Sequence, residues 1–94
     1  CIIDKNKSTD RAIKIDNIKK KFLSFNWNVV TCNGHSHENL IKVLKKKSSK
    51  PLAIIANTTK GKGVKFMELN QHEWHHKKID NATLKKIKNE IFKK

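Results

Sequence analysis

Three short apolar runs mark the chain, at residues 1–3, 27–32 and 52–56. The second and third runs are rich in β-branched side chains and are bounded by turn-forming residues. Short apolar runs of this composition are typical of strands that are buried on both faces of a parallel sheet. The pattern therefore predicts three strands.

A helical period separates the first two runs. Residues 14–25, KIDNIKKKFLSF, place Ile15, Ile18, Phe22 and Phe25 at the spacing of one helix face. This spacing predicts an amphipathic helix that packs one face against the sheet.

A second helix is expected between the second and third runs. Asn33-Gly34 indicates a turn, and Ser36 is a suitable N-cap for the helix that follows. The apolar positions expected to share the face of this helix are Leu40, Ile41, Val43 and Leu44. Alternation of strands and helices with short connections favours an α/β fold, a parallel sheet with flanking helices and right-handed crossovers.

The last third of the chain combines a loop with a closing helix. Residues 57–76 show no strong period, which predicts a loop of about twenty residues, and loops of that length in compact domains are usually functional or disordered. Asp80-Asn81 then forms a capping pair, and Leu84, Ile87 and Ile91 lie on one stripe of a terminal helix.

The loop contains a glycine–lysine turn, Lys60-Gly61-Lys62-Gly63. Glycines let backbone N–H groups approach a ligand closely, and two ammonium groups lie beside them, so the turn could hold a diphosphate. A plain turn in a lysine-rich chain is the alternative. Ligands of open parallel sheets bind outside the carboxyl ends of the strands, and this loop leaves such an end.

Five histidines lie on two of the expected strand-end loops. His72, His75 and His76 follow the glycine–lysine turn, and His35 and His37 follow the second strand. Imidazoles at this edge could donate to an anion or move protons near neutral pH. Two alternatives remain open: a structural zinc site, and surface histidines without a role, the latter above all for His37 and His72.

Composition limits the size and setting of the domain. Ninety-four residues suffice for one small domain or part of a larger one, with a thin core that leans on a partner. Two cysteines are too few for a disulfide scaffold, which predicts reduced thiols. No apolar run approaches the roughly 20 residues of a membrane span. We therefore expect a soluble, cytoplasmic protein, and the apolar start at Cys1 indicates a fragment.

The formal net charge is +14, and Arg11 is the only arginine. Specific phosphate and base recognition favours the planar fork of arginine, whereas scattered lysines are typical of a solvated surface. A lysine-rich polyanion-binding module stays open as an alternative, but nucleic acid is not the expected partner.

Two segments, FLSFNWNVVTCNGHSHENLIKVL and KPLAIIANTTKGKGVKFMELNQHEWHH, resemble the thiamine-diphosphate-binding domain of transketolase, in particular the amino-terminal subunit of split transketolases. The matching features are Asn26-Trp27-Asn28-Val29, Asn33-Gly34-His35, Lys50-Pro51 through Met67-Glu68, and Trp74-His75-His76. Order and spacing agree over about three quarters of the chain. The resemblance identifies residues 1–94 as one partial domain of this kind, its carboxyl-proximal part.

The resemblance implies thiamine diphosphate and a divalent cation, Mg²⁺ or Ca²⁺, bound between this domain and a pyrimidine-binding domain or subunit of the same enzyme in a homo- or hetero-oligomer. It implies sugar phosphates as substrates. By the same resemblance, His75 contacts the diphosphate and the substrate oxygens and is catalytic, while Lys60, Gly61 and Gly63 belong to the cofactor loop. Asn6 and Ser8 match the two positions that bind the metal, Ser8 through its carbonyl.

Several family features are missing. The Gly-Asp-Gly motif, whose aspartate binds the metal, and the upstream histidines of the sugar channel do not occur in this sequence. His76 stands where the family has the glycine of Trp-His-Gly, and Lys7 stands where it has a glycine after Asn6. The resemblance predicts transfer of a two-carbon ketol unit between sugar phosphates, with little or no activity from this chain alone. A degenerate, non-catalytic remnant is the alternative.

Overall fold

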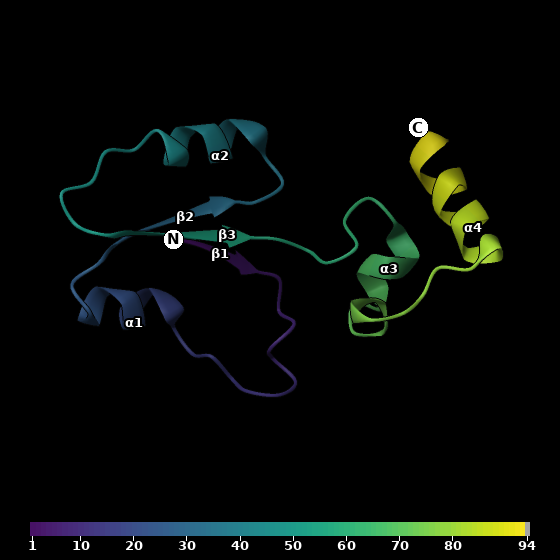
Figure 1. The fold of residues 1–94 in the computed structure, drawn as a ribbon, viewed down its shortest axis with the longest axis horizontal. Helices are drawn as coiled ribbons and strands as arrows, with labels where there is room; N and C mark the ends of the chain where they lie inside the picture. The colour runs from purple at the N-terminus through teal and green to yellow at the C-terminus, as the bar shows by residue number, and fades with distance from the viewer. Residues whose placement is uncertain (94) are drawn as a thin grey trace. The chain divides into compact units, whose positions relative to one another are not determined.

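A computed structural model describes residues 1–93. The chain divides into two compact units, Cys1–Thr58 and Thr59–Lys94. The elements in chain order are β1 (Ile2–Lys5), α1 (Ile18–Ser24), β2 (Asn28–Asn33), α2 (His37–Leu44), β3 (Leu52–Asn57), α3 (Lys65–Leu69), a 3₁₀ helix (Glu73–His75) and α4 (Asn81–Phe92) (Figure 1).

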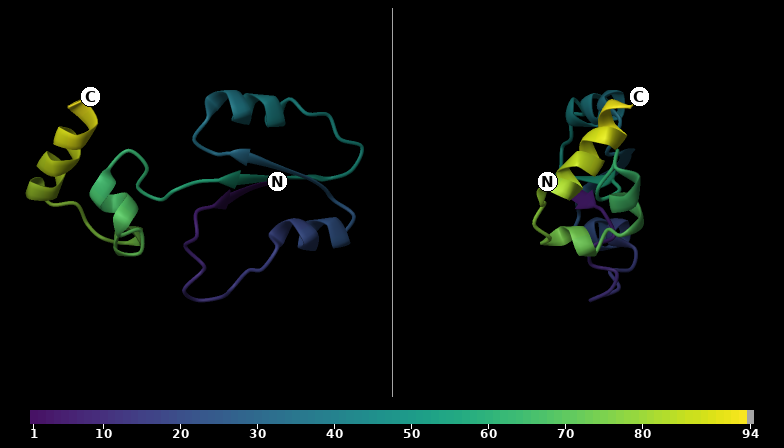
Figure 2. Two further views of the ribbon diagram at one scale, coloured as in Figure 1. Left: turned by 180° about the vertical axis from the view of Figure 1, so that it is seen from behind. Right: turned by 90° about the vertical axis from the view of Figure 1, so that its right-hand side faces the viewer.

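The first unit is a three-stranded sheet in the order β1-β3-β2, with both pairs parallel. Helices α1 and α2 lie on opposite faces of this sheet (Figure 2). Asn57 is in register with Lys5 of β1 and with Asn33 of β2, so the carboxyl ends of the three strands lie side by side. The predicted α/β fold with a parallel sheet and flanking helices is confirmed.

The central strand β3 carries most of the burial. Ala53, Ile54 and Ile55 are 0%, 5% and 3% exposed, so β3 is buried on both faces as predicted. The same prediction is wrong for β2, where Cys32 is buried but Thr31 is exposed. The reason is that β2 is an edge strand. It pairs with β3 on one side only, so no neighbouring strand covers its other side.

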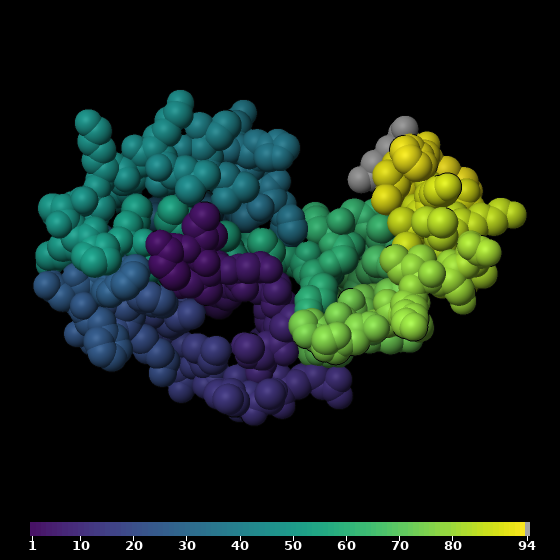
Figure 3. All heavy atoms as spheres, viewed as in Figure 1, coloured from purple at the N-terminus to yellow at the C-terminus, as the bar shows by residue number. Residues whose placement is uncertain are grey.

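Strand β1 is the other edge of the sheet. It runs two residues beyond the apolar run that predicted it, and only Ile3 is partly buried. The space-filling view shows these first residues, in purple, lying open between the blue residues of α1 and the teal residues around α2 (Figure 3). The amino-terminal strand therefore supplies the sheet with backbone pairing more than with core side chains.

Helix α1 is shorter than its periodic pattern predicted. Asn17 caps it by accepting the Lys20 N–H at 3.1 Å, which leaves Ile15 before the helix. The helix ends before Phe25, which is 78% exposed, and Asn26 follows with a φ of 64°. A left-handed residue ends the helical repeat, so the prediction that Ile15 and Phe25 belong to the packed face is wrong.

Helix α2 begins as predicted. The Ser36 hydroxyl accepts the Asn39 N–H at 3.2 Å, the N-cap bond expected from the sequence. Of the predicted apolar face, Val43 is buried and Leu40 packs against the core, but Ile41 and Leu44 are 52% and 57% exposed. Because a sheet covers only a narrow stripe of a helix, the wider face is not buried within this unit. The residues of this core are Cys32, Val43, Ile54 and Ala56, with Val30, Leu40 and Leu52 packed against them.

The second unit replaces the predicted long loop with ordered structure. The five-residue helix α3 and the 3₁₀ helix lie inside residues 57–76, so the prediction of one loop over this whole range is wrong. A helix of little more than one turn is too short to show a periodic apolar pattern. The closing helix α4 is confirmed, with Asp80 as its N-cap at 2.7 Å from the Thr83 nitrogen. That bond also lowers the pKa of Asp80.

The helices of residues 1–93 are all too short or too polar to cross a membrane.

Candidate functional site

The glycine–lysine turn depends on its two glycines for its shape. Gly61 has a φ of 77° and Gly63 a φ of 99°, values that residues with a side chain rarely adopt. A Cβ on Gly61 would lie 2.5 Å from the Cβ of Met67 on α3, a distance that permits no side chain. The middle of α3 therefore packs directly on the turn.

The turn already holds a carboxylate of its own chain. The Gly63 N–H donates to Oε1 of Glu68 at 2.8 Å, and the Lys62 ammonium lies 3.7 Å from the same oxygen. This arrangement is consistent with a turn that favours an anion. The anion is Glu68, so Lys62 and the Gly63 N–H serve the fold of this unit.

Lys60, the first lysine of the turn, contacts His75. Its Nζ lies 2.8 Å from Nδ1 of His75, across fifteen residues of chain. An ammonium group can only donate hydrogen bonds, so Nδ1 must be the acceptor. The contact therefore places the imidazole proton on Nε2, and His75 presents an N–H donor on the side away from Lys60.

The charge around His75 favours the neutral imidazole. The Lys60 ammonium lowers the pKa of His75 from its ordinary 6.5, and His76 lowers it further. The rings of His75 and His76 meet edge to face with centroids 4.3 Å apart. At neutral pH His75 is therefore an uncharged group with a fixed donor.

Trp74 anchors the backbone beside His75. Its ring packs edge to face on Phe66 of α3 with centroids 5.5 Å apart, and the Lys77 ammonium lies 4.8 Å from the Trp74 centroid. Within residues 1–93, the indole nitrogen of Trp74 is buried without a hydrogen-bond partner. Ring packing, with no hydrogen bond from the indole, holds this side chain in place.

A second group of polar residues follows β1. The Asn6 amide oxygen accepts the Ser8 N–H at 2.9 Å, and the residue between them, Lys7, has a φ of 64°. Asn6 also donates from Nδ2 to Asp4 at 3.0 Å. The hydroxyl of Thr58, just after β3, donates to the other oxygen of Asp4.

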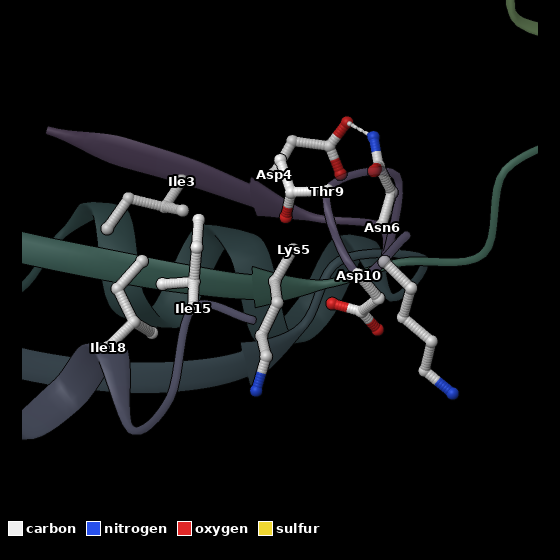
Figure 4. A pocket seen from close by; sticks show the side chains of 9 residues that line it. Ile3, Asp4, Lys5, Asn6, Thr9, Asp10, Ile15 and Ile18 are labelled. Carbon is white, nitrogen blue, oxygen red and sulfur yellow. Dashed lines mark hydrogen bonds between the residues drawn. The ribbon is translucent and has the colours of Figure 1, made fainter. Parts of the chain in front are cut away.

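Asp4 and Asn6 border a cavity of about 160 Å³ in the first unit. Figure 4 shows the amide of Asn6 turned toward the carboxylate of Asp4, with Ile3, Ile15 and Ile18 at the apolar end. The remaining lining residues are Lys5, Lys7, Thr9 and Asp10. Oxygen atoms thus gather at the carboxyl end of β1, where the sheet topology predicts a ligand edge.

The predicted site residues fall into two groups, one in each unit. Lys60, Gly61, Gly63 and His75 belong to the second unit, where Lys60 and His75 meet. Asn6 and Ser8 belong to the first, where they share a hydrogen bond. Within residues 1–93, no three histidine, cysteine or acidic side chains gather as metal ligands would.

Three further polar residues of the site were not predicted. Glu68 holds the glycine–lysine turn, Asp4 holds Asn6, and Thr58 holds Asp4. Asp4 and Thr58 are 54 residues apart and meet only because β1 and β3 are neighbours. Their one signal in the sequence is that each lies at the carboxyl end of a predicted strand.

Comparison with known proteins adds the decisive observation. The apulose-4-phosphate transketolase subunit from Phocaeicola vulgatus is 32% identical over 83 residues, covering 80% of the chain, and its namesake from Actinobacillus succinogenes is 37% identical over 83 residues, covering 81%. Transketolase from Mus musculus is 33% identical over 79 residues, covering 84%. The chain belongs to the transketolase family.

This transketolase-family chain matches only part of each relative. It spans 29% and 30% of the two apulose-4-phosphate transketolase subunits and 12% of the mouse transketolase. No family model matches the chain. No solved structure matches it either.

Proposed function

We propose that the chain is part of a transketolase-like enzyme that transfers a two-carbon ketol unit between sugar phosphates. The contact between Lys60 and His75 is the observation that supports this most directly, because it joins the predicted cofactor turn to the predicted catalytic residue. The relatives named transketolase cover four fifths of the chain and favour the same activity. Residues 1–94 would then be one part of a larger cofactor-binding domain.

In this proposal His75 acts as a neutral donor. Its Nε2–H can bond to a hydroxyl or carbonyl oxygen of the sugar, or to a diphosphate oxygen. Lys60 fixes the imidazole orientation through Nδ1 and adds a positive charge that favours an anionic ligand. Gly61 and Gly63 shape the turn that carries Lys60.

The proposed cofactor is thiamine diphosphate with Mg²⁺ or Ca²⁺. When bound, the cofactor supplies the nucleophilic carbon that takes up the two-carbon unit. The amide oxygen of Asn6 and the carbonyl oxygen of Ser8 fit such a cation, because hard cations prefer oxygen ligands. Two protein oxygens are fewer than a divalent cation needs, so further ligands have to come from the diphosphate, water or another part of the enzyme.

The proposed partner is a pyrimidine-binding domain or subunit of the same enzyme. Two of the relatives are named as a subunit of a transketolase, and such a name belongs to an assembly of several subunits. The proposed substrates are sugar phosphates, and the same relatives are named for apulose-4-phosphate. We propose a homo- or hetero-oligomer on these grounds.

To test this proposal, the matched segment of the Phocaeicola vulgatus transketolase subunit is replaced by this chain. The hybrid subunit is combined with the other subunits it requires, and its transketolase turnover is measured. Replacement of His75 by alanine should lower turnover by roughly 100-fold or more, the range of a lost general acid–base group. His72→Ala is the matched control, since a surface position is expected for His72, and turnover should stay within about twofold. A hybrid that is active and insensitive to His75→Ala would contradict the role of His75.

A further inference from the structure

Both carboxylate oxygens of Asp4 hold a hydrogen-bond donor. Oδ2 accepts the Asn6 amide nitrogen at 3.0 Å, and Oδ1 accepts the Thr58 hydroxyl. Asp4 lies in β1, Asn6 lies in the turn after β1, and Thr58 directly follows β3. Thr58 thus holds Asp4, and Asp4 holds Asn6. Figure 4 shows the Asn6 amide turned toward the Asp4 carboxylate.

An ionised carboxylate accepts hydrogen bonds and donates none. The side-chain amide of asparagine has a donating nitrogen at one end and an accepting oxygen at the other, and the two ends are nearly equal in shape. A carboxylate beside one end therefore decides which atom faces it. Asp4 turns the Asn6 nitrogen toward itself and the Asn6 oxygen away.

The Asn6 oxygen keeps capacity for a ligand in this orientation. It accepts one hydrogen bond, from the Ser8 N–H at 2.9 Å. An amide oxygen has two lone pairs, so a second interaction remains open. Because a hard cation binds the oxygen of an asparagine and is repelled by its N–H₂ group, the orientation decides whether Asn6 can act as a ligand.

We infer that Asp4 is a positioning residue that holds the Asn6 amide with its oxygen available to a divalent cation. This inference rests on the proposed function, which places the cation at Asn6 and Ser8. Asp4 acts through Asn6, since both of its own oxygens are engaged with donors. Thr58 in turn fixes the Asp4 carboxylate.

The first measurement needs no metal. In the ¹⁵N-labelled 94-residue protein, the two Nδ2 protons of Asn6 should resonate far apart, because one of them bonds to a carboxylate. Asp4→Asn should bring the two signals closer together, because a neutral amide oxygen at position 4 accepts a weaker hydrogen bond than a carboxylate does. Asp10→Asn is the matched control: Asp10 lines the same cavity and loses the same charge, and the Asn6 signals should stay in place.

The second measurement uses MnCl₂ as a paramagnetic probe. Mn²⁺ should broaden the backbone amide signals of Asn6 and Ser8 in the unaltered protein. Asp4→Asn should raise the Mn²⁺ concentration needed for equal broadening about tenfold or more, the usual effect of losing a group that orients a metal ligand. Asp10→Asn should raise it about twofold at most, the effect of losing one charge near the site without losing the bond to Asn6.

The outcomes separate the inference from the proposed function. If Mn²⁺ fails to broaden Asn6 and Ser8 in the unaltered protein, the cation site of the proposed function fails, and with it the purpose assigned to Asp4. If broadening occurs but Asp4→Asn and Asp10→Asn weaken it equally, only the positioning role is overturned. Unmoved Asn6 side-chain signals in Asp4→Asn overturn it as well.

Thr58→Val gives a second, nearly isosteric way to disturb Asp4. It removes the hydroxyl that holds Oδ1 and leaves the bond from Asn6 to Asp4 in place. The Asn6 signals should move in the same direction as in Asp4→Asn, by a smaller amount, and Thr58→Ser should restore them. Signals that stay fixed in both Asp4→Asn and Thr58→Val would refute the inference even if one variant folds poorly.

Discussion

His75 has two close neighbours, the Lys60 ammonium and the His76 imidazole. Both neighbours oppose protonation, which is why the pKa of His75 lies below the ordinary histidine value. Because the lysine is the donor in the contact, the same neighbour also selects the tautomer of the ring. One side chain therefore sets the charge and the proton position of the proposed catalytic residue.

Replacing Lys60 with glutamine should raise the pKa of His75 toward 6.5, because the main charge that disfavours the imidazolium is gone. The ring would then begin to protonate at a higher pH as the solution is acidified. An NMR titration of the His75 Cε1–H signal measures this. Lys62→Gln is the control, since Lys62 pairs with Glu68. A rise as large in Lys62→Gln as in Lys60→Gln would argue against the direct contact.

Two helix N-caps were predicted correctly from the sequence. Ser36 and Asp80 cap helices as expected, because the hydroxyl or carboxylate of a cap bonds within three residues and needs no tertiary structure. The run at β3 was also correct, since a strand buried on both faces is apolar throughout. The length of α1 was wrong, because Asn17 caps the helix two residues after Ile15, where the apolar period begins.

Only some of the polar contacts of the candidate site could be predicted from the sequence. His75, Lys60 and Asn6 could be singled out because their segments resemble a known motif. The contact of Asp4 with Thr58 depends on β1 lying beside β3, and the strand order is set by packing of the whole sheet. The role of Glu68 depends on α3, a helix too short to be predicted from its period.

Helix α3 and the glycine–lysine turn should respond differently to two alanine substitutions. Gly63→Ala adds strain from a positive φ alone, roughly 1–2 kcal/mol, because nothing lies within 4 Å of the added Cβ. Gly61→Ala adds similar strain and also drives a Cβ against Met67, so its loss of unfolding free energy should be greater. Urea denaturation followed by tryptophan fluorescence measures both losses. Equal losses would mean that α3 does not pack on the turn.

The molecule as a whole has a small core and a strong positive charge. Among residues 1–93, large apolar side chains such as Phe25, Leu69 and Phe92 are 75–78% exposed. The chain also spans less than a third of the relatives it matches. Large apolar side chains exposed in this way are typical of a surface that packs against another part of a protein.

The charge is expected to be a general property of the surface. Lys42, Lys45 and Lys46 line one groove, and another cluster, Lys85, Lys86 and Lys88, lies on α4. We expect glutamine substitution of either trio to weaken binding to single-stranded RNA equally, because the lysines act through net charge alone. Titrations at several salt concentrations measure this. The slope of the logarithm of affinity against the logarithm of salt concentration reports the number of phosphate contacts. If substitution of Lys42, Lys45 and Lys46 alone reduced this slope by about one per lysine, the groove would be a true polyanion site.

Gly34, which directly follows β2, affects the position of Asn6 through Thr58 and Asp4. A Cβ at position 34 would lie 2.5 Å from the Thr58 methyl carbon and 3.1 Å from the Asn57 carbonyl oxygen. Any larger residue would have to displace Thr58, whose hydroxyl steadies the aspartate behind Asn6. A substitution at Gly34 would thus shift Thr58, and through Asp4 it would change the arrangement of oxygen atoms after β1.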